Sequence, residues 1–205
     1  MEISHVIRGE DHISNTPKQI LMQEALGFYQ PIYAHLPLIL APDRTKLSKR
    51  HGSVSIREYR EQGYLPEALV NFMVLLGWNP GTEKEIFTLA SLVKEFSLEK
   101  VQKPGAIFNV QKLDFINSFY IREKSVERLT ELCLPYLISA KLIEEYSGGY
   151  KNLETGEEIL LVTLQKIINA HKLRMKKLSE IGELADFFFK EKLDYQKEML
   201  KWQQM

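Results

Sequence analysis

Residues 3–40, ISHVIRGEDHISNTPKQILMQEALGFYQPIYAHLPLIL, decide the expected fold of the N-terminal part. Residues 3–7 are rich in β-branched side chains and precede a polar stretch, which predicts a buried strand that ends in a loop. An Asn-Thr-Pro sequence ending at Pro17 predicts a helix start, Gly27 predicts its end, and residues 33–40 predict a second strand. A strand, a helix and a strand in this order form one βαβ unit, which favours a parallel sheet.

Beyond the loop that follows, the pattern is helical with short breaks. Residues that start, cap or end helices recur along it: Ser55 with Glu58, Gly63, Pro66, Thr88, Asn109 and Ser125. Pro135 is expected to bend or interrupt the last of these helices, and residues 146–150 indicate a linker-like break. Further helices are predicted over residues 157–174 and 179–190 and over the tail. The expected fold class is therefore mostly α with a small α/β start.

The composition is that of a globular protein of one or two domains. The 205 residues are 44% hydrophobic and 26% charged, too apolar for wholesale disorder, and the net charge is zero. The single cysteine, Cys133, excludes an internal disulfide or a multi-cysteine zinc site, and its apolar neighbours predict a buried, inert thiol. Because no apolar run is long enough for a membrane span and no signal peptide is visible, we expect a cytoplasmic protein without membrane contact.

The zero net charge conceals two local excesses of basic side chains. Residues 43–60 hold six bases against two acids, an excess of +4. Between Glu158 and Glu180 there is no acid but there are five bases: Lys166, Lys172, Arg174, Lys176 and Lys177. Such clusters can neutralise the phosphates of a nucleic acid. A solvated helix face, or cations that compensate a helix C-terminus, would give the same pattern, so both interpretations of the second cluster stay open.

The first excess of basic residues centres on a predicted loop, PDRTKLSKRHG at residues 42–52, in which the bases have a regular arrangement around a serine. Lys46, Lys49 and Arg50 bracket Ser48, so that a hydroxyl lies among three cations. Cations, a hydroxyl and backbone N–H groups suit a triphosphate whose charge shifts during displacement at the α-phosphorus. A lysine can follow that shift as a mobile point charge, whereas an arginine offers a fixed fork.

KLSKR, residues 46–50, is similar to the signature loop of class I aminoacyl-tRNA synthetases, usually written KMSKS. Five flanking or overlapping stretches strengthen the likeness: SHVIRGEDHISNTPKQ, AHLPLILAPDRTKLSKRHG, REQGYLPEALVNFMVLLGW, FNVQKLDFIN and FYIRE. Together they resemble the bacterial type of glutamyl-tRNA synthetase from residue 3 to about residue 122. Leu47 replaces the methionine of the family loop and Arg50 replaces its final serine.

The resemblance implies roles for individual residues. Arg8 matches the arginine that binds the substrate glutamate, and a guanidinium fork suits a carboxylate. Asp11 matches an acidic position near ATP and the tRNA end, and Ile39 matches the position whose backbone meets adenine. The catalytic set implied in the loop is Lys46, Ser48, Lys49 and Arg50, of which Lys49 also contacts ATP. ATP with Mg²⁺ is then the expected co-substrate, with no protein-bound metal. Without the resemblance, Arg8 would be interpreted as an ion-pair partner of Glu10 or Asp11.

The resemblance also implies three regions, none of them complete. Residues 1–40 match the C-terminal part of a Rossmann-like catalytic domain, residues 41–122 the stem-contact region with the KLSKR loop, and residues 123–205 part of a helical anticodon-binding domain. The first class I signature, written HIGH, is absent from the sequence, so Met1 is expected to be an internal methionine of a longer protein. The histidines His5, His12 and His35 lack metal-ligand spacing, and Trp78 is expected to anchor packing.

Two principal functions are therefore considered. The first is a glutamate–tRNA ligase with tRNA(Glu), glutamate and ATP as partners, in a family that is usually monomeric, with the isolated chain expected to be inactive. The second is a non-catalytic tRNA-binding module derived from a synthetase. A helical interaction protein that merely retains the sequence is the third, and the intact KLSKR loop disfavours it.

Overall fold

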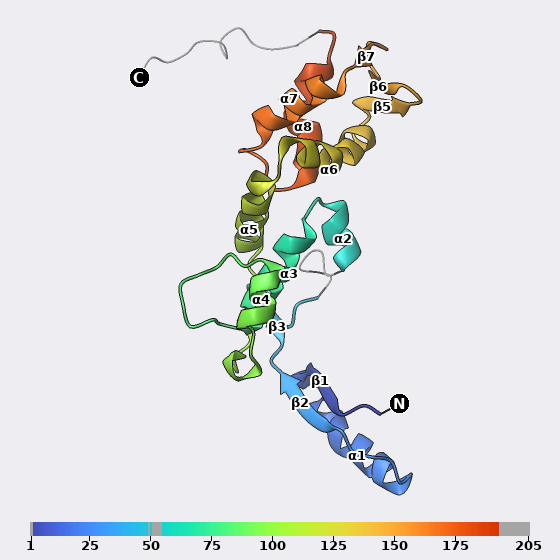
Figure 1. Cartoon of the computed structure of the whole chain (residues 1–205). Helices are drawn as coiled ribbons and strands as arrows, with labels where there is room; N and C mark the ends of the chain where they lie inside the picture. Colours follow the sequence, from blue (N-terminus) through green and yellow to red (C-terminus); the bar gives the residue numbers. More distant parts are fainter. Residues whose placement is uncertain (1, 49, 51–54, 193–205) are drawn as a thin grey trace. The chain divides into compact units, whose positions relative to one another are not determined.

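A computed structural model describes residues 2–48, 50 and 55–192 (Figure 1). Contacts divide the chain into two compact units. The first comprises residues 1–58 and 66–116, and the second comprises residues 59–65 and 117–205. Within the described residues, no helix is long and apolar enough to cross a membrane.

The first unit begins with the predicted βαβ arrangement. Strand β1 (His5–Gly9) pairs in parallel with β2 (Ile32–Leu36), and the 3₁₀ helix η1 (Glu10–Asn15) and helix α1 (Thr16–Ala25) connect them. Pro17 lies in the first turn of α1 as predicted, and Gly27 follows its end with a φ of 67°, a conformation that glycine adopts without strain.

The second predicted strand is broken rather than continuous. Strand β2 ends at Leu36, and β3 (Ile39–Leu40) pairs in parallel with β4 (Ala106–Ile107) instead of extending β2. Pro37 explains the break because it has no N–H group for a ladder bond. The next N–H group, that of Leu38, donates to the Glu10 carboxylate at 3.1 Å.

The helical elements that follow are, with their bounds, α2 (Ile56–Glu61), α3 (Pro66–Gly77), α4 (Leu89–Glu95), η3 (Leu98–Lys100) and α5 (Val110–Glu123). The capping box is confirmed, since the Glu58 N–H donates to Ser55 Oγ at 3.2 Å and the Ser55 N–H donates to the Glu58 carboxylate at 3.3 Å. The predicted packing role of Trp78 is also confirmed, because its side chain is buried in a cluster with Phe87 and Leu92.

The second unit combines helices with a small antiparallel sheet. Its elements are α6 (Val126–Ser139), β5 (Ile143–Tyr146), β6 (Gly149–Asn152), β7 (Glu158–Ile159), α7 (Leu161–His171), η4 (Leu178–Glu180), α8 (Ile181–Ala185) and η5 (Asp186–Phe189). The strands lie in the order β5-β6-β7. The helix predicted over the tail, beyond residue 192, falls outside the described residues.

Several predictions for this unit need correction. Of the two effects expected of Pro135, a bend or an interruption, the interruption does not occur, since α6 runs through Pro135. Leu129, Cys133 and Leu137, spaced four residues apart, are fully buried and anchor the helix on both sides of the proline. Residues 146–150 form the turn of the β5–β6 hairpin rather than a linker, with Tyr146 paired to Gly149.

The helix predicted over residues 157–174 begins only at Leu161, because residues 158 and 159 form β7. Residues 179–190 form the end of η4 followed by α8 and η5, so the single predicted helix is three short ones.

Residues 59–65 belong to the second unit through specific hydrogen bonds. The buried side chain of Asn117 accepts from the Leu65 N–H at 2.8 Å and donates to the Lys176 carbonyl at 2.6 Å. The Leu178 N–H donates to the Gly63 carbonyl at 3.0 Å. A Cβ at position 63 would lie 2.5 Å from the Ser179 nitrogen, and φ there is 87°, so this close approach requires glycine.

Burial of Cys133 gives the first testable prediction. The side chain is fully buried, as the sequence predicts, and desolvation raises the pKa of the thiol to about 12. The thiolate is the reactive form, and at pH 8 it would be about 10⁻⁴ of the population. We expect an aromatic disulfide reagent to label the folded chain at least about 100-fold more slowly than the chain in urea, measured by absorbance. Cys133→Ala should abolish labelling in both states, and equal rates in the two states would show that the thiol is accessible.

Candidate functional site

The side chain of Arg8 is held at the point where β1 ends. Its Nη2 donates to Thr16 Oγ1 at 2.7 Å, and its guanidinium carbon lies 5.3 Å from the centroid of the Tyr33 ring. Glu10 and Asp11, the alternative partners considered for Arg8, bind other groups: Glu10 accepts from the Leu38 N–H and Asp11 pairs with Lys46. Nε is buried and has no acceptor among the described residues, so the N–H groups left for a ligand are the two of Nη1 and the second one of Nη2.

The loop after β3 is a tight turn fixed by its own backbone. The Ala41 N–H donates to the Thr45 carbonyl and the Arg44 N–H to the Ala41 carbonyl, both at 2.8 Å. Asp43 Oδ1 accepts from the backbone N–H of Thr45 at 3.0 Å and from its hydroxyl at 2.7 Å. Arg44 adopts a φ of 63°, and Lys46 forms a β-bridge with Leu40. The turn therefore returns the chain to β3 at Lys46.

An ion pair connects this loop to the end of β1. Lys46 Nζ lies 2.7 Å from Asp11 Oδ2, and the two side chains are 60% and 36% exposed. The hydrogen bond from Lys46 lowers the pKa of Asp11 below its ordinary value. A Cβ at position 9 would lie 2.5 Å from Asp11 Oδ1, so the absence of a side chain at Gly9 allows the carboxylate to take this position.

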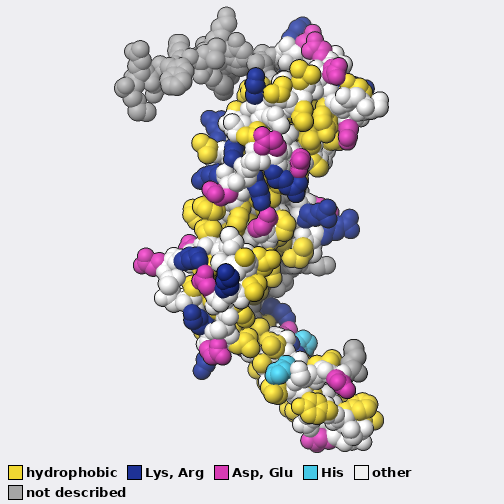
Figure 2. All heavy atoms as spheres, in the orientation of Figure 1, with side chains coloured by type: hydrophobic (Ala, Val, Ile, Leu, Met, Phe, Trp, Pro, Cys, Tyr) yellow, Lys and Arg dark blue, Asp and Glu magenta, His cyan; other side chains and the backbone are white. Residues whose placement is uncertain are grey.

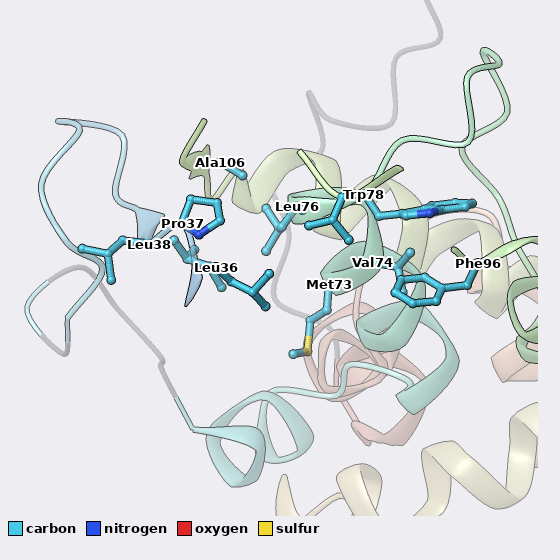
Figure 3. Close-up of a pocket in the computed structure, with 12 residues that line it drawn as sticks. Leu36, Pro37, Leu38, Met73, Val74, Leu76, Trp78, Phe96 and Ala106 are labelled. Atoms are coloured by element: carbon cyan, nitrogen blue, oxygen red, sulfur yellow. The ribbon is translucent and has the colours of Figure 1, made fainter. Parts of the chain in front are cut away.

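Ile39 is one of the residues that line an apolar cavity of about 250 Å³. Figure 3 shows this cavity with other lining residues labelled. The Ile39 carbonyl accepts from the Leu47 N–H at 3.0 Å, which attaches the loop to β3 a second time. The cavity lies between the segment that carries Leu36 and Leu38 and the side chains of α3, Trp78 and Phe96. Ile39 therefore connects the loop, through its backbone, to the strand that borders the apolar cavity.

The first unit contains Arg8, Asp11, Ile39 and Lys46 of the predicted site. The Lys46–Asp11 pair and the Leu47–Ile39 bond connect the loop to Asp11 and Ile39, whereas the contacts described for Arg8 are with Thr16 and Tyr33. Ser48 is half-buried and Arg50 is exposed. Lys49 lies outside the described residues. Within the described residues, no group of three or more histidine, cysteine or acidic side chains is arranged to hold a metal ion.

The five bases predicted to bind tRNA lie in the second unit and differ in their surroundings. Lys172 Nζ donates to the Lys124 carbonyl at 2.6 Å, just after the C-terminal end of α5, where cations are favoured. Lys177 Nζ lies 5.5 Å from the centroid of the Tyr64 ring. Glu180 folds back to accept from the Lys176 N–H at 2.7 Å. Figure 2 shows basic and acidic side chains interspersed over the visible face. Lys166, Arg174 and Lys176 remain exposed.

The sequence does not single out the residues that hold Arg8. Thr16 features there only as part of a predicted helix start, and nothing connects His35 or Tyr33 with Arg8. The register of β1 and β2 places Arg8 opposite His35, and alternation along β2 places Tyr33 and His35 on one face. The alternation that places Tyr33 and His35 on one face can be predicted from the sequence. The register that places Arg8 opposite His35 cannot be predicted in this way.

Comparison with known proteins assigns this geometry to a family. Residues 1–115 match the model described as tRNA synthetases class I (E and Q), catalytic domain. The chain belongs to this family. Residues 128–205 match the model of an anticodon binding domain. The resemblance drawn from KLSKR and its flanks is thus confirmed, and so is the expected fold of a partial catalytic domain followed by an anticodon-binding region.

Individual relatives agree with the family assignment. The chain is 50% identical to the glutamate–tRNA ligase of Carboxydothermus hydrogenoformans, over 97% of this chain and 39% of the relative. It is 47% identical to glutamate–tRNA ligase 1 of Caldicellulosiruptor saccharolyticus, over 98% and 41%. The crystal structure of a glutamate tRNA ligase from Elizabethkingia meningosepticum in complex with its amino acid matches with a TM-score of 0.75 and 32% identity, over 97% and 40%. The chain therefore spans about two fifths of the length of these relatives.

The Lys46–Asp11 pair gives the second testable prediction. Because the hydrogen bond from Lys46 lowers the pKa of Asp11, Lys46→Met should raise that pKa toward its ordinary value. The stabilisation from the pair is present above the unfolded-state pKa and is lost as the pH falls through the folded-state value. We expect carboxyl-carbon NMR titration to show the Asp11 midpoint at higher pH in Lys46→Met and unchanged in Lys18→Met, a control on α1. An unchanged midpoint in Lys46→Met would show that the pair does not persist in solution.

Proposed function

We propose that this chain supplies the glutamate-binding arginine and the phosphate-binding loop of a glutamate–tRNA ligase. In that reaction a glutamate carboxylate oxygen attacks the α-phosphorus of ATP, giving glutamyl-adenylate and pyrophosphate. A hydroxyl at the 3′ end of tRNA(Glu) then attacks the carbonyl carbon of the adenylate, which forms the ester to the tRNA and releases AMP. One observation carries the proposal: Arg8, held by Thr16, and the loop held by Lys46 and Asp11 occur in one unit of a chain 50% identical to such a ligase.

Each residue has a proposed role. Arg8 binds a carboxylate of glutamate through its guanidinium fork, while Asp11 and the backbone of Ile39 contact ATP. The loop residues Lys46, Ser48, Lys49 and Arg50 stabilise the charge that develops on the phosphates. Mg²⁺ is expected to arrive with ATP, because magnesium usually keeps several waters and binds through substrate phosphates.

Catalysis of this kind needs no covalent protein nucleophile. The attacking oxygen belongs to the substrate, so the protein contributes positioning and electrostatic stabilisation. The Lys46–Asp11 pair suits a loop that must exchange partners, since exposed pairs are weak and a phosphate is the stronger acceptor. We therefore expect Lys46 to leave Asp11 when a triphosphate binds.

The chain is proposed to act as part of a larger protein. It spans about two fifths of the relatives' length, so the isolated chain is expected to lack activity. The proposed partners are tRNA(Glu), glutamate and ATP, and the proposed setting is the cytoplasm, with a monomeric enzyme.

A chimera tests the ligase proposal. The region of the Carboxydothermus ligase that matches this chain would be replaced by this chain, and glutamate-dependent pyrophosphate exchange would be measured. We expect activity from the chimera and none from the isolated chain. Arg8→Gln should lower kcat/KM for glutamate roughly 100-fold, because charged hydrogen bonds contribute about 1.5–3 kcal/mol each. Lys18→Gln should have no effect. Exchange by the isolated chain, or an active Arg8→Gln chimera, would contradict the proposal.

The exposed bases of the second unit support tRNA binding by that unit, which would also serve the non-catalytic alternative. We expect the chain to bind tRNA with a steep salt dependence. Arg174→Glu with Lys176→Glu should weaken binding and lower the magnitude of the slope of log K against log salt by about 0.7–0.9 for each phosphate that the variant no longer neutralises. Lys141→Glu, an exposed base of the same unit, is the control. Binding by filter retention that is unchanged in the double variant would identify the stretch as solvated surface.

A further inference from the structure

We propose that Thr16 and His35 are positioning residues that fix the guanidinium of Arg8. The proposal rests on the proposed function in one respect, the use of Arg8 to bind glutamate. The contacts themselves belong to the structure and can be tested without any activity.

Thr16 Oγ1 has three polar neighbours. It donates to the His12 carbonyl at 3.0 Å, it accepts from Arg8 Nη2 at 2.7 Å, and it lies 3.0 Å from His35 Nε2. A hydroxyl has one hydrogen and two lone pairs. Since the hydrogen is given to the His12 carbonyl, both lone pairs accept, and His35 must carry a proton on Nε2. The hydroxyl is then fully used, and Arg8 and His35 donate to the same oxygen.

This oxygen provides the directional contact of the guanidinium. The guanidinium carbon of Arg8 lies 5.3 Å from the centroid of the Tyr33 ring, within cation–π distance, but a cation–π contact sets no direction for the individual N–H groups. Nε of Arg8 is buried and has no acceptor among the described residues, so it does not set this direction. The bond from Nη2 to Thr16 therefore sets the direction in which the remaining N–H groups point.

The contacts of Thr16 tie that direction to the fold. His35 lies opposite Arg8 in the β1–β2 register, His12 belongs to η1, and Thr16 is the first residue of α1. Thr16 is 9% exposed, so water competes little for its hydroxyl. One hydroxyl thus joins β2, η1 and α1 to the side chain of β1 that is proposed to bind the substrate. His35 contributes by occupying the second lone pair and restraining the hydroxyl.

Nitrogen-15 NMR of the chain tests the arrangement directly. We expect His35 to show the tautomer protonated at Nε2, and the Arg8 Nε–H to show a heteronuclear NOE close to that of the ordered backbone. Thr16→Val, which keeps the shape but removes the hydroxyl, should lower that NOE markedly, and Thr16→Ser should restore it. His35→Gln, whose amide can donate, should retain more order than His35→Phe. Thr163→Val, an exposed threonine on α7, is the matched control.

Backbone amide spectra show whether each variant folds. If Thr16→Val does not fold, the Arg8 NOE in Thr16→Ser and in the two His35 variants still tests the arrangement. Two results would overturn the proposal: an Arg8 NOE that is the same in Thr16→Val as in the unchanged chain, or a His35 tautomer protonated only on Nδ1. The opposite results support it.

The chimera adds the functional readout. Thr16→Val should raise KM for glutamate about tenfold, as expected when one charge-assisted hydrogen bond is removed, and leave KM for ATP within about twofold. A merely structural role would lower stability and affect both substrates, which would count against positioning. If the unchanged chimera shows no dependence on glutamate, the proposed function fails, whereas the NMR result still decides whether Thr16 and His35 position Arg8.

Discussion

The parallel register of β1 and β2 is the constraint on which the site depends. Five residue pairs place Arg8 opposite His35 and Gly9 opposite Leu36. A slip of one residue would turn every side chain of a strand to the other face, and His35 would leave the face that Thr16 occupies. The guanidinium, its aromatic support and its hydroxyl acceptor are therefore consequences of one pairing.

The loop is held in a different way, by backbone bonds that do not involve its functional side chains. Bonds from the N–H groups of Ala41 and Leu47 return the chain to β3, and Asp43 closes the turn. Lys46 adds an exposed ion pair, which contributes little to stability because solvent screens it. A rigid turn that carries a weakly engaged lysine suits a cation that must move to a phosphate.

Local rules predict part of the fold correctly. The capping box of Ser55 and Glu58 and the glycine stop at Gly27 depend on neighbouring residues alone, and the sequence contains them. Pro135 does not interrupt α6, because buried contacts from both sides of it outweigh its missing N–H group. Residues 146–150 contain two adjacent glycines, which are typical both of a linker and of a hairpin turn. Only the pairing of β5 with β6 shows that they form a turn. Arg8 is predicted by resemblance, whereas Thr16 and His35 require the register.

The βαβ segment exposes several large apolar side chains, and this exposure affects whether the segment can form the proposed glutamate site by itself. Parallel sheets are normally covered on both faces, and a two-stranded sheet is small for independent stability. Leu21, Phe28 and Ile32 are 64%, 63% and 60% exposed. Relatives with more than twice the length have further chain with which to cover such surface. The proposed glutamate site therefore needs that additional sequence for the burial that makes hydrogen bonds to Arg8 strong, as well as for the remaining substrate contacts.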